Sequence, residues 1–372
     1  MKTGRLESLD ILRGFDLWLL LFAGPVVRAI CSCTQGPLRD FVEVQTEHPA
    51  WTGFVLWDII MPLFIFMSGA TIPFSMARYR SGTHPGREFW LKLTRRFVLL
   101  FFLGWIVQGN LLTFEPRLFH PFANTLQAIA VGYAVAAVAY VYGGVRAQTI
   151  VAAVFFAAYF LIFSLNGQLD PDPQDNVAMW VDKAVLGCHR DGVVWAEDGS
   201  WMYKDSYRYT WILSSLNFAV TAILGSLSGH HLRNSSRTPS GRALILAVIA
   251  ALLVAAGLAL GCVNPINKKI WNSSMTLYSG GICGLMLALS YYIVDVKGWK
   301  KGLNWLKYYG CNSIVAYCIG EVISFKSVSK SVLFGFERLI PEFYPVLIAL
   351  ANVSILFLIL RILYKRGIFL KV

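Results

Sequence analysis

A histidine and an aspartate, His48 and Asp58, lie ten residues apart in the stretch HPAWTGFVLWDIIMPLFIFMSGATIP, which joins a polar loop to an apolar run. Imidazole exchanges protons near neutral pH, and a carboxylate can orient it and stabilise its charged form. Asp58 falls inside the apolar run, where an ionisable group must be paired or hydrated and therefore indicates a functional site. The pair predicts a catalytic base and its partner. The alternatives are a solvated loop histidine and a structural acid bonded to another helix.

The composition places this pair in a membrane protein. Apolar residues make up 56% of the chain and charged residues 15%, against about 45–50% and about 25% in soluble domains. The apolar residues come in blocks of roughly 17–25, the length that crosses a bilayer as a helix. The sequence therefore predicts an all-α, polytopic membrane protein that forms a single domain over residues 1–372. About ten transmembrane helices are expected, at residues 10–30, 53–77, 97–112, 125–142, 149–165, 211–227, 243–262, 275–294, 308–324 and 346–364.

The charges between these blocks predict an orientation. Basic residues gather in the loops on the side of both termini, whereas the long segment 166–209 on the other side is rich in aspartate. The positive-inside rule then gives N-in and C-in, makes 166–209 a long external loop and turns His48 outward. A bacterial inner membrane is expected, with the His48 loop facing the periplasm or the exterior. No cleavable signal is expected, because the apolar run after Asp10 lacks a small-residue cleavage site.

The net charge of +12 is explained by these short basic clusters, so no nucleic-acid partner is expected. Seven cysteines are present. Three lie in predicted helices, and the other four lie in or beside outward loops, where one or two disulfides are possible if that side is oxidising: Cys31, Cys33, Cys188 and Cys262. The spacing of Cys31 and Cys33 is not that of a metal site, and no metal is expected.

Asp10, Arg13 and Asp16 recur every three residues at the start of the first predicted span, on roughly one helical face. One interpretation is a self-neutralising ion network at the membrane boundary. The other is that Arg13, with Asp10 beside it, meets a phosphate in a cavity open to the cytoplasm, since guanidinium binds phosphate well.

Other polar side chains near the apolar blocks are candidates for substrate contacts. For the amides, a hydrogen bond between helices is the alternative, and for the two lysines a solvated turn. The candidates are Trp51, Asn124, Gln127, Asn264, Lys268, Lys269 and Asn312.

Four stretches resemble a known family. They are RLESLDILRGFD, the segment from His48 to Pro73 quoted above, LQAIAVGY, and NPINKKIWNSSMTLYSGG with DVKGW and GCNSIVAY downstream. The chain is similar here to the heparan-α-glucosaminide N-acetyltransferases and their bacterial relatives, within the transmembrane acyltransferases. The first, second and fourth stretches are long enough to be specific.

The resemblance implies transfer of an acetyl group from cytosolic acetyl-CoA to the amino group of a terminal glucosamine across the membrane. It implies that His48 is the catalytic histidine, that Asp58 is its partner, and that the protein is a homodimer. One position departs from the family: Phe22-Ala23-Gly24-Pro25 stands where the family has an asparagine near the outer end of the first core helix. Gln35, Gln45 or Asn124 are the candidates to replace it.

The expected function is that of an acyl-CoA-dependent N- or O-acetyltransferase acting on an external sugar. Acyl-CoA is the co-substrate, a glycan or small molecule the acceptor, and membrane lipid the surroundings. A transporter or carrier of a sugar or lipid-linked substrate is the alternative, because such proteins also bury acids in their spans. A non-enzymatic relative is the third reading, because of Gly24.

Overall fold

The computed structural model describes residues 6–80, 86–109, 111–112, 114–204, 209–234 and 236–370. It is 72% helical with almost no sheet, which confirms the all-α prediction. The chain divides into two compact units. The first comprises the described residues of Met1–Pro49, Val55–Ile60 and Ser290–Val372, and the second Ala50–Phe54 and Met61–Leu289.

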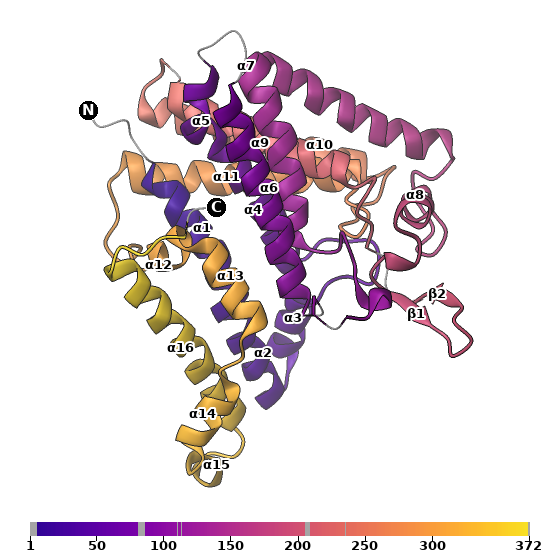
Figure 1. The fold of residues 1–372 in the computed structure, drawn as a ribbon. Coiled ribbons are helices and arrows are strands. Elements are labelled where there is room, and N and C mark those ends of the chain that lie inside the picture. Colours follow the sequence, from indigo (N-terminus) through magenta and orange to yellow (C-terminus); the bar gives the residue numbers. More distant parts are fainter. Residues whose placement is uncertain are drawn as a thin grey trace. The chain divides into compact units, whose positions relative to one another are not determined.

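The first unit begins with a continuous helical run, α1 (Glu7–Trp18), the π-helical turn η1 (Leu19–Ala23) and α2 (Gly24–Cys33). A turn at Gly36 leads to α3 (Pro37–Thr46), and η2 (Leu56–Ile59) follows the His48 loop. The C-terminal part contributes η6 (Tyr292–Val296), α12 (Leu306–Cys311), α13 (Ser313–Val322), α14 (Lys326–Leu333), α15 (Phe336–Leu339) and α16 (Tyr344–Lys365). In this unit α16 packs against α2, and α14 packs against α16 (Figure 1).

Two glycines allow α1 and α12 to pack backbone to backbone. A β-carbon at Gly14 would lie 2.0 Å from the carbonyl oxygen of Leu306, and one at Gly310 would lie 1.8 Å from that of Asp10. Small residues at a crossing let two membrane helices approach closely. Ile11, Val294 and Leu306 form a small apolar core beside this crossing.

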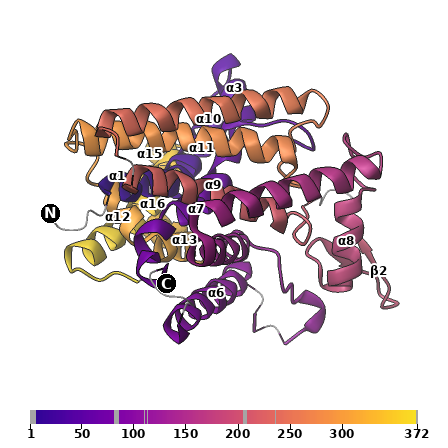
Figure 2. The same cartoon turned by 90° about the horizontal axis from the view of Figure 1, so that it is seen from above.

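The second unit holds most of the helices. They are α4 (Ile60–Ala70), α5 (Ile72–Ser75), η3 (Ala77–Arg80), α6 (Arg87–Gln108), η4 (Pro116–Leu118), α7 (Thr125–Leu165), α8 (Val177–Leu186), η5 (Gly187–His189), α9 (Ser215–Asn234), α10 (Pro239–Gly261) and α11 (Ser273–Tyr291), whose last two residues belong to the first unit. α9 lies along α7 and α4 (Figures 1 and 2). Its Gly225 sits so close to α4 that a β-carbon would lie 1.9 Å from the carbonyl oxygen of Phe66.

The expected spans 125–142 and 149–165 leave a gap that begins at Gly143-Gly144, and the helix breaks at Gly144. This residue has φ +62° and ψ −142°, which is not helical, inside the 41-residue α7. A positive φ of this kind favours glycine because it has no side chain. The two parts of α7 run in different directions on either side of Gly144 (Figure 1).

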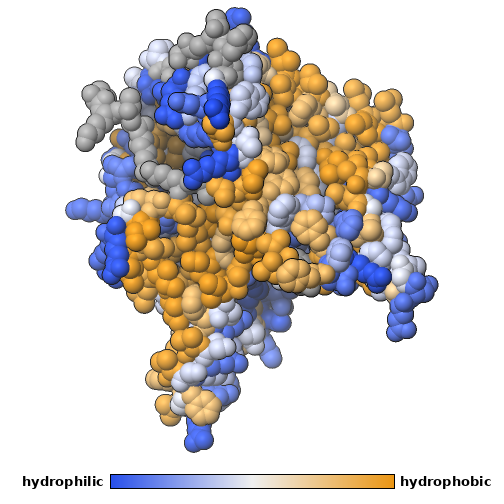
Figure 3. Space-filling model, in the orientation of Figure 1, coloured by the Kyte–Doolittle hydropathy of each residue, from blue (hydrophilic) through white to orange (hydrophobic). Residues whose placement is uncertain are grey.

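Among the described residues, six helical segments are long and apolar enough to cross a membrane: Glu7–Cys33, Leu56–Ser75, Thr125–Leu165, Pro239–Gly261, Ser273–Val296 and Tyr344–Lys365. Each of the ten expected segments overlaps a helix, but two of them share α7, and α6, α9 and α12–α13 do not meet this criterion. A membrane protein is therefore supported, while the number of spans stays a prediction. On the face shown in Figure 3, apolar residues gather over α16 and the C-terminal part of α7.

The segment 166–209 has structure of its own, apart from residues 205–208, which lie outside the described part. α8 and η5 precede a two-stranded antiparallel hairpin, β1 (Val193–Trp195) and β2 (Trp201–Tyr203), with Trp195 opposite Trp201. Cations cover aromatic rings on one face of the hairpin, Arg117 over Trp195 at 4.9 Å and Arg190 over Tyr203 at 4.6 Å. These rings therefore pack the hairpin against Arg117 and Arg190.

The disulfides considered for four cysteines are not formed in the described part of the chain, where Cys31, Cys33, Cys188 and Cys262 have free thiols.

Candidate functional site

His48 and Asp58 meet in the first unit. Nδ1 of His48 lies 2.6 Å from Oδ1 of Asp58. The imidazole is 40% exposed, whereas the carboxylate is fully buried. A short contact between a buried acid and an accessible imidazole is the arrangement in which the acid fixes the tautomer and stabilises the imidazolium formed during proton transfer.

The local fold around Asp58 explains why it can reach His48. α3 ends at Thr46, the chain crosses a loop, and η2 begins at Leu56, directly ahead of α4. Oδ2 of Asp58 accepts a hydrogen bond from the backbone N–H of Val55 at 3.0 Å, which holds the carboxylate at the N-terminus of this helical run. Oε1 of Gln45 accepts one from the N–H of Leu56 at 3.1 Å and ties the end of α3 to the start of η2. Asp58 therefore uses one oxygen for the fold and presents the other to His48.

The side chain of Trp57 fills the space beside Gly24, the position that differs from the family that the sequence resembles. A β-carbon at Gly24 would lie 2.2 Å from Cη2 of Trp57, so the indole packs directly on the glycine backbone of α2. The guanidinium of Arg28, one turn further along α2, lies 5.6 Å from the Trp57 ring centroid. Gly24 therefore makes room for an indole whose neighbour in the chain is Asp58.

Two of the predicted substrate residues, Trp51 and Lys269, anchor the short segment Ala50–Phe54 in the second unit. Nε1 of Trp51 donates to the carbonyl of Pro171 at 3.0 Å. Nζ of Lys269 donates to the carbonyl of Ala50 at 2.6 Å and lies 5.9 Å from the ring of Tyr209. The N–H of Gly53 donates to the carbonyl of Ile266 at 2.8 Å. Loops distant in sequence thus meet on the segment that follows His48.

The loop before α11 is held by its own asparagines. Nδ2 of Asn264 donates to the carbonyl of Leu169 at 2.5 Å. Oδ1 of the fully buried Asn267 accepts the N–H of Lys269 at 2.8 Å, and Oδ1 of Asn272 accepts the N–H of Met275 at 3.1 Å. Lys268 is also buried. These asparagine contacts shape the loop that presents Lys269.

Three further candidates also make contacts that serve the fold. Oδ1 of Asn124 caps α7 by accepting the N–H of Leu126 at 2.8 Å. The buried Gln127 accepts from the N–H of Ala123 and donates to the carbonyl of Pro121. In the first unit, Nδ2 of Asn312 donates to the carbonyl of Ile368 at 3.1 Å and so holds the segment after α16.

The ion network expected at Asp10, Arg13 and Asp16 forms only in part. Nη1 of Arg13 lies 3.8 Å from Oδ1 of Asp10 and 3.5 Å from the carbonyl oxygen of Gly310. Asp16 does not join them: it is fully buried, and neither carboxylate oxygen has a hydrogen-bond partner among the described residues. A network of all three charges is therefore not formed among the described residues, and only Asp10 and Arg13 lie within ion-pair distance. The side chain of Arg13 remains one-fifth exposed, which suits contact with a phosphate.

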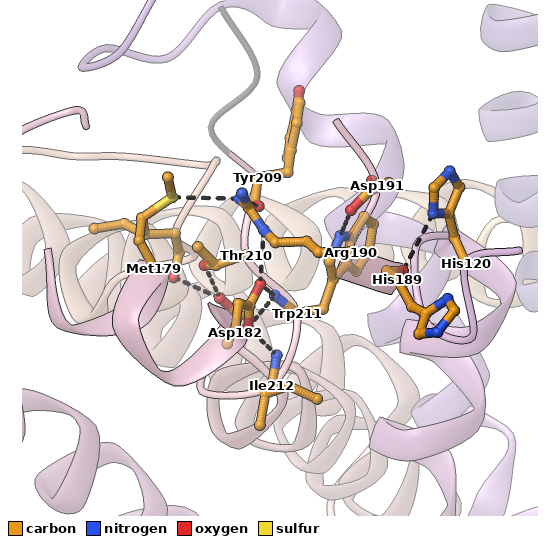
Figure 4. Close-up of polar contacts among 12 residues, drawn as sticks. His120, Met179, Asp182, His189, Arg190, Asp191, Tyr209, Thr210, Trp211 and Ile212 are labelled. Atoms are coloured by element: carbon orange, nitrogen blue, oxygen red, sulfur yellow. Dashed lines mark hydrogen bonds and ion pairs between the residues drawn. The ribbon is translucent and has the colours of Figure 1, made fainter. Parts of the chain in front are cut away.

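Sequence reasoning missed a buried ionic cluster in the segment 166–214, shown in Figure 4. Nε of Arg190 lies 3.4 Å from Oδ2 of Asp182, and both side chains are fully buried. Asp182 also accepts the backbone N–H groups of Trp211 and Ile212 at 2.9 Å each. Nε1 of Trp211 donates to Oδ1 of Asp191 at 2.9 Å. The cluster joins α8 and η5 to the chain entering α9.

Burial controls the titration of this cluster. It raises the pKa of Asp191 to about 7, although the indole N–H of Trp211 and the charge of Arg190 act in the opposite direction. Burial also raises the pKa of Asp182, against the hydrogen bonds from Ile212 and Trp211. The charges lie scattered along a polar stretch with no recognisable spacing, so the sequence carries no signal that would have identified them.

One family model matches the chain. Its description is "Domain of unknown function (DUF5009)", and it covers residues 5–119. The match therefore includes His48, Asp58, Gly24 and Trp57, but less than a third of the chain. No curated protein matches this chain.

Proposed function

We propose that this protein is a transmembrane acyltransferase that moves an acetyl or other acyl group from acyl-CoA to an amino group or hydroxyl of a sugar. The observation that carries the proposal is the contact of 2.6 Å between Nδ1 of the accessible His48 and the fully buried Asp58. A carboxylate that is fixed by a backbone N–H on one oxygen and by imidazole on the other is suited to orient a general base.

The chemistry needs one base and one leaving group. As the acceptor nitrogen or oxygen attacks the thioester carbonyl carbon, His48 takes the acceptor's proton. The carbon–sulfur bond then breaks, and the proton passes from the imidazolium to the departing CoA thiolate. The products are the acylated sugar and CoA with a free thiol. In the alternative sequence His48 first carries the acyl group itself and then gives it to the acceptor.

The donor is expected to enter from the cytoplasm. In the second unit, basic side chains cluster about α5, η3 and the C-terminal part of α9, where Arg80 lies 5.5 Å from the ring of Tyr140 and Lys92 donates to the carbonyl of Ser75. The positive-inside rule assigns this end to the cytoplasm, with N-in and C-in in a bacterial inner membrane. Its basic side chains would offer cations to the phosphates of CoA. In the first unit, Arg13 near Asp10 is a separate candidate for such a contact. We also propose that the protein is a homodimer, as the family resemblance implies.

The acceptor is expected on the opposite side. Trp51 and Lys269 accompany the segment that follows His48, and an ammonium group with an indole suits an anionic or hydroxyl-rich sugar. Asn264 and Lys268 support this loop from within. In the second unit, Asn124 and Gln127 hold the start of α7. In the first unit, Asn312 holds the segment after α16.

The test is acyl transfer by purified protein in nanodiscs. Wild-type protein with acetyl-CoA and glucosamine-containing acceptors should release CoA and give an acetylated product detectable by mass spectrometry. His48→Ala should lower the rate by about 10³-fold or more, and Asp58→Asn by a similar factor, because the imidazole loses its orienting charge. The matched control is His189→Ala, which removes another exposed histidine and should leave the rate unchanged. Full transfer by His48→Ala would overturn the assignment.

A carrier of a sugar or lipid-linked substrate is the second candidate, and Asp16 favours it. A fully buried carboxyl group in a membrane-spanning helix, without a hydrogen-bond partner among the described residues, is a common feature of proton- or substrate-coupled transport. Uptake of labelled amino sugar into proteoliposomes, lost in Asp16→Asn and kept in His48→Ala, would support the carrier. CoA release lost in His48→Ala and kept in Asp16→Asn would support the enzyme.

A further inference from the structure

α3, the helix directly ahead of His48, presents its apolar side chains outward. None of its ten residues is buried. Leu38, Phe41 and Val44 are 76%, 63% and 59% exposed. Their spacing of three places them in one stripe along the helix. A contiguous apolar stripe of this kind on a folded protein marks an interaction surface.

The rest of α3 is charged and makes its own contacts. Nη2 of Arg39 lies 2.9 Å from Oε2 of Glu43, one turn later, and Nη1 lies 3.3 Å from Oδ1 of Asp40. A short helix with an ion-paired polar face and an apolar stripe has the pattern of a helix that lies in the plane of a membrane interface. The acids offset the single arginine, so this pattern does not require anionic lipid.

The connection to α2 fixes the depth of α3. Three residues lie between the run Glu7–Cys33 and Pro37, and the four steps from Cys33 to Pro37 reach at most about 14 Å. Gly36, with φ +114°, turns the chain out of the direction of α2. Nε of Arg39 donates back to the carbonyl of Cys31 at 3.2 Å. α3 therefore lies at the level where α2 leaves the apolar layer.

A second helix of the first unit repeats the arrangement. α14 follows the apolar α13 by three residues, and exposes Val328 and Val332 on one side and Lys326 and Lys330 on the other. It packs on α16, which packs on α2, and lies with α15 at the end of α16 away from the C-terminus (Figure 1). α3 and α14 are unrelated in sequence, and each exposes an apolar stripe close to the end of an apolar helix. This repetition favours lipid, which covers any apolar surface, over a protein partner that fits one particular surface.

We propose that α3 is seated in the lipid headgroup region, with Leu38, Phe41 and Val44 inserted among the acyl chains, and that this seating sets His48 at the lipid–water boundary. Thr46 ends the helix two residues before His48, and Gln45 ties that end to Leu56, next to the Asp58 segment. A base held at this level reaches the head of an amphiphile more readily than a glycan far from the bilayer. The acceptor class is therefore a membrane-anchored, lipid-linked amino sugar, a conclusion that rests on the proposed function.

The seating is tested without any reaction. Full-length protein carrying the photo-crosslinking residue p-benzoylphenylalanine in place of Phe41 is reconstituted in phosphatidylcholine vesicles and irradiated. A lipid adduct is expected at position 41, and none at position 40, where the same residue replaces Asp40 on the charged face. Absence of lipid adducts at position 41 would overturn the seating, and so would a crosslink there to a second copy of the chain.

The acceptor class is tested by comparing two acceptors. With a lipid-linked glucosamine in the same vesicles, Phe41→Gln should lower acyl transfer about tenfold, and with soluble glucosamine it should leave the slow rate unchanged. Asp40→Asn is the matched control and should change neither rate. Equal loss on both acceptors, or a wild-type preference for the soluble one, would overturn the acceptor class. If wild-type protein acylates neither acceptor, the proposed function fails, while the crosslinking result still decides the seating of α3.

Discussion

The indole of Trp57 packs on Gly24 so closely that a β-carbon at position 24 would lie 2.2 Å from Cη2 of the ring. An asparagine, which the acyltransferase family that the sequence resembles has at this position, therefore has no room here. The space beside Gly24 is filled by the Trp57 indole, with Arg28 over its face, and the residue next to Trp57 in the chain is Asp58.

Gly24→Asn is therefore expected to destabilise the protein by about 1–3 kcal/mol through overpacking. Thermal unfolding in detergent should show a lower Tm, and the double variant with Trp57→Ala should recover part of the loss, because the smaller residue vacates the space. Gly335→Asn is the control, since no atom lies within 4 Å of a β-carbon there. Equal tolerance of asparagine at positions 24 and 335 would contradict the packing.

Gly14→Ala should disrupt the crossing of α1 and α12. The added methyl group would lie 2.0 Å from the carbonyl oxygen of Leu306, a backbone atom that cannot rotate away. We expect a loss of about 3 kcal/mol or more, seen as poor yield of monodisperse protein and a lower Tm. Gly335→Ala should behave as wild type.

Trp51→Phe keeps the ring but removes the N–H that binds the carbonyl of Pro171. Pro171 is buried, so its carbonyl oxygen would lose a partner at a cost of about 1–3 kcal/mol. Hydrogen exchange in the segment around Pro171 should become faster. Trp180→Phe, which removes a bond to the exposed Asp175, should have a much smaller effect.

Asp191 should make the second unit less stable as the pH rises. Its pKa is about 7 in the folded protein against an ordinary value of 3.8, so the folded state binds the proton more tightly. The stability contributed by the protonated form is complete below about pH 4 and is lost as the pH rises through about 7. Asp191→Asn, which imitates the neutral acid, should therefore raise the Tm more at about pH 8 than at about pH 5.

Asp198→Asn is the control, because the pKa of Asp198 is lowered in the folded protein whereas that of Asp191 is raised. The side-chain and backbone hydrogen bonds from Ser200 lower the pKa of the exposed Asp198, so its ionised form is favoured in the folded state. Its replacement should give no gain in Tm at high pH. A Tm of Asp191→Asn that follows the wild-type value at every pH would contradict the role of burial.

The sequence was sufficient to predict the main elements of the fold and the central pair. Apolar block length predicts where helices lie, because bilayer thickness sets a common length, and Gly143-Gly144 correctly predicted the break in α7. His48 and Asp58 were paired from their chemistry, and the loop between α3 and η2 brings them to 2.6 Å. The substrate roles of Trp51 and Lys269 stay predictions, but Trp51 lies in the short segment Ala50–Phe54 and Lys269 contacts that segment through the carbonyl of Ala50.

Other features depend on tertiary contacts that no local pattern encodes. Trp57 looks like an ordinary aromatic residue of an apolar run until α2 is placed beside it. Arg190 and Asp182 lie in a polar stretch typical of a solvated loop, yet both are fully buried because Trp211 and Ile212 return to the same place. Asp10, Arg13 and Asp16 share one helical spacing, yet only Asp10 lies within ion-pair distance of Arg13, and the spacing alone does not distinguish the two acids.

The bonds that hold Ala50–Phe54 also impose an order on biosynthesis. The hydrogen bond of Trp51 cannot form until Pro171 has been synthesised, 120 residues later. The bond of Ala50 requires Lys269, which is synthesised 219 residues later. While the ribosome is still adding those residues, the segment after His48 has none of these partners, although the spans on either side of it are already made. The segment Ala50–Phe54 therefore lacks its full set of contacts until synthesis of the chain is nearly three-quarters complete, when the Lys269 loop emerges.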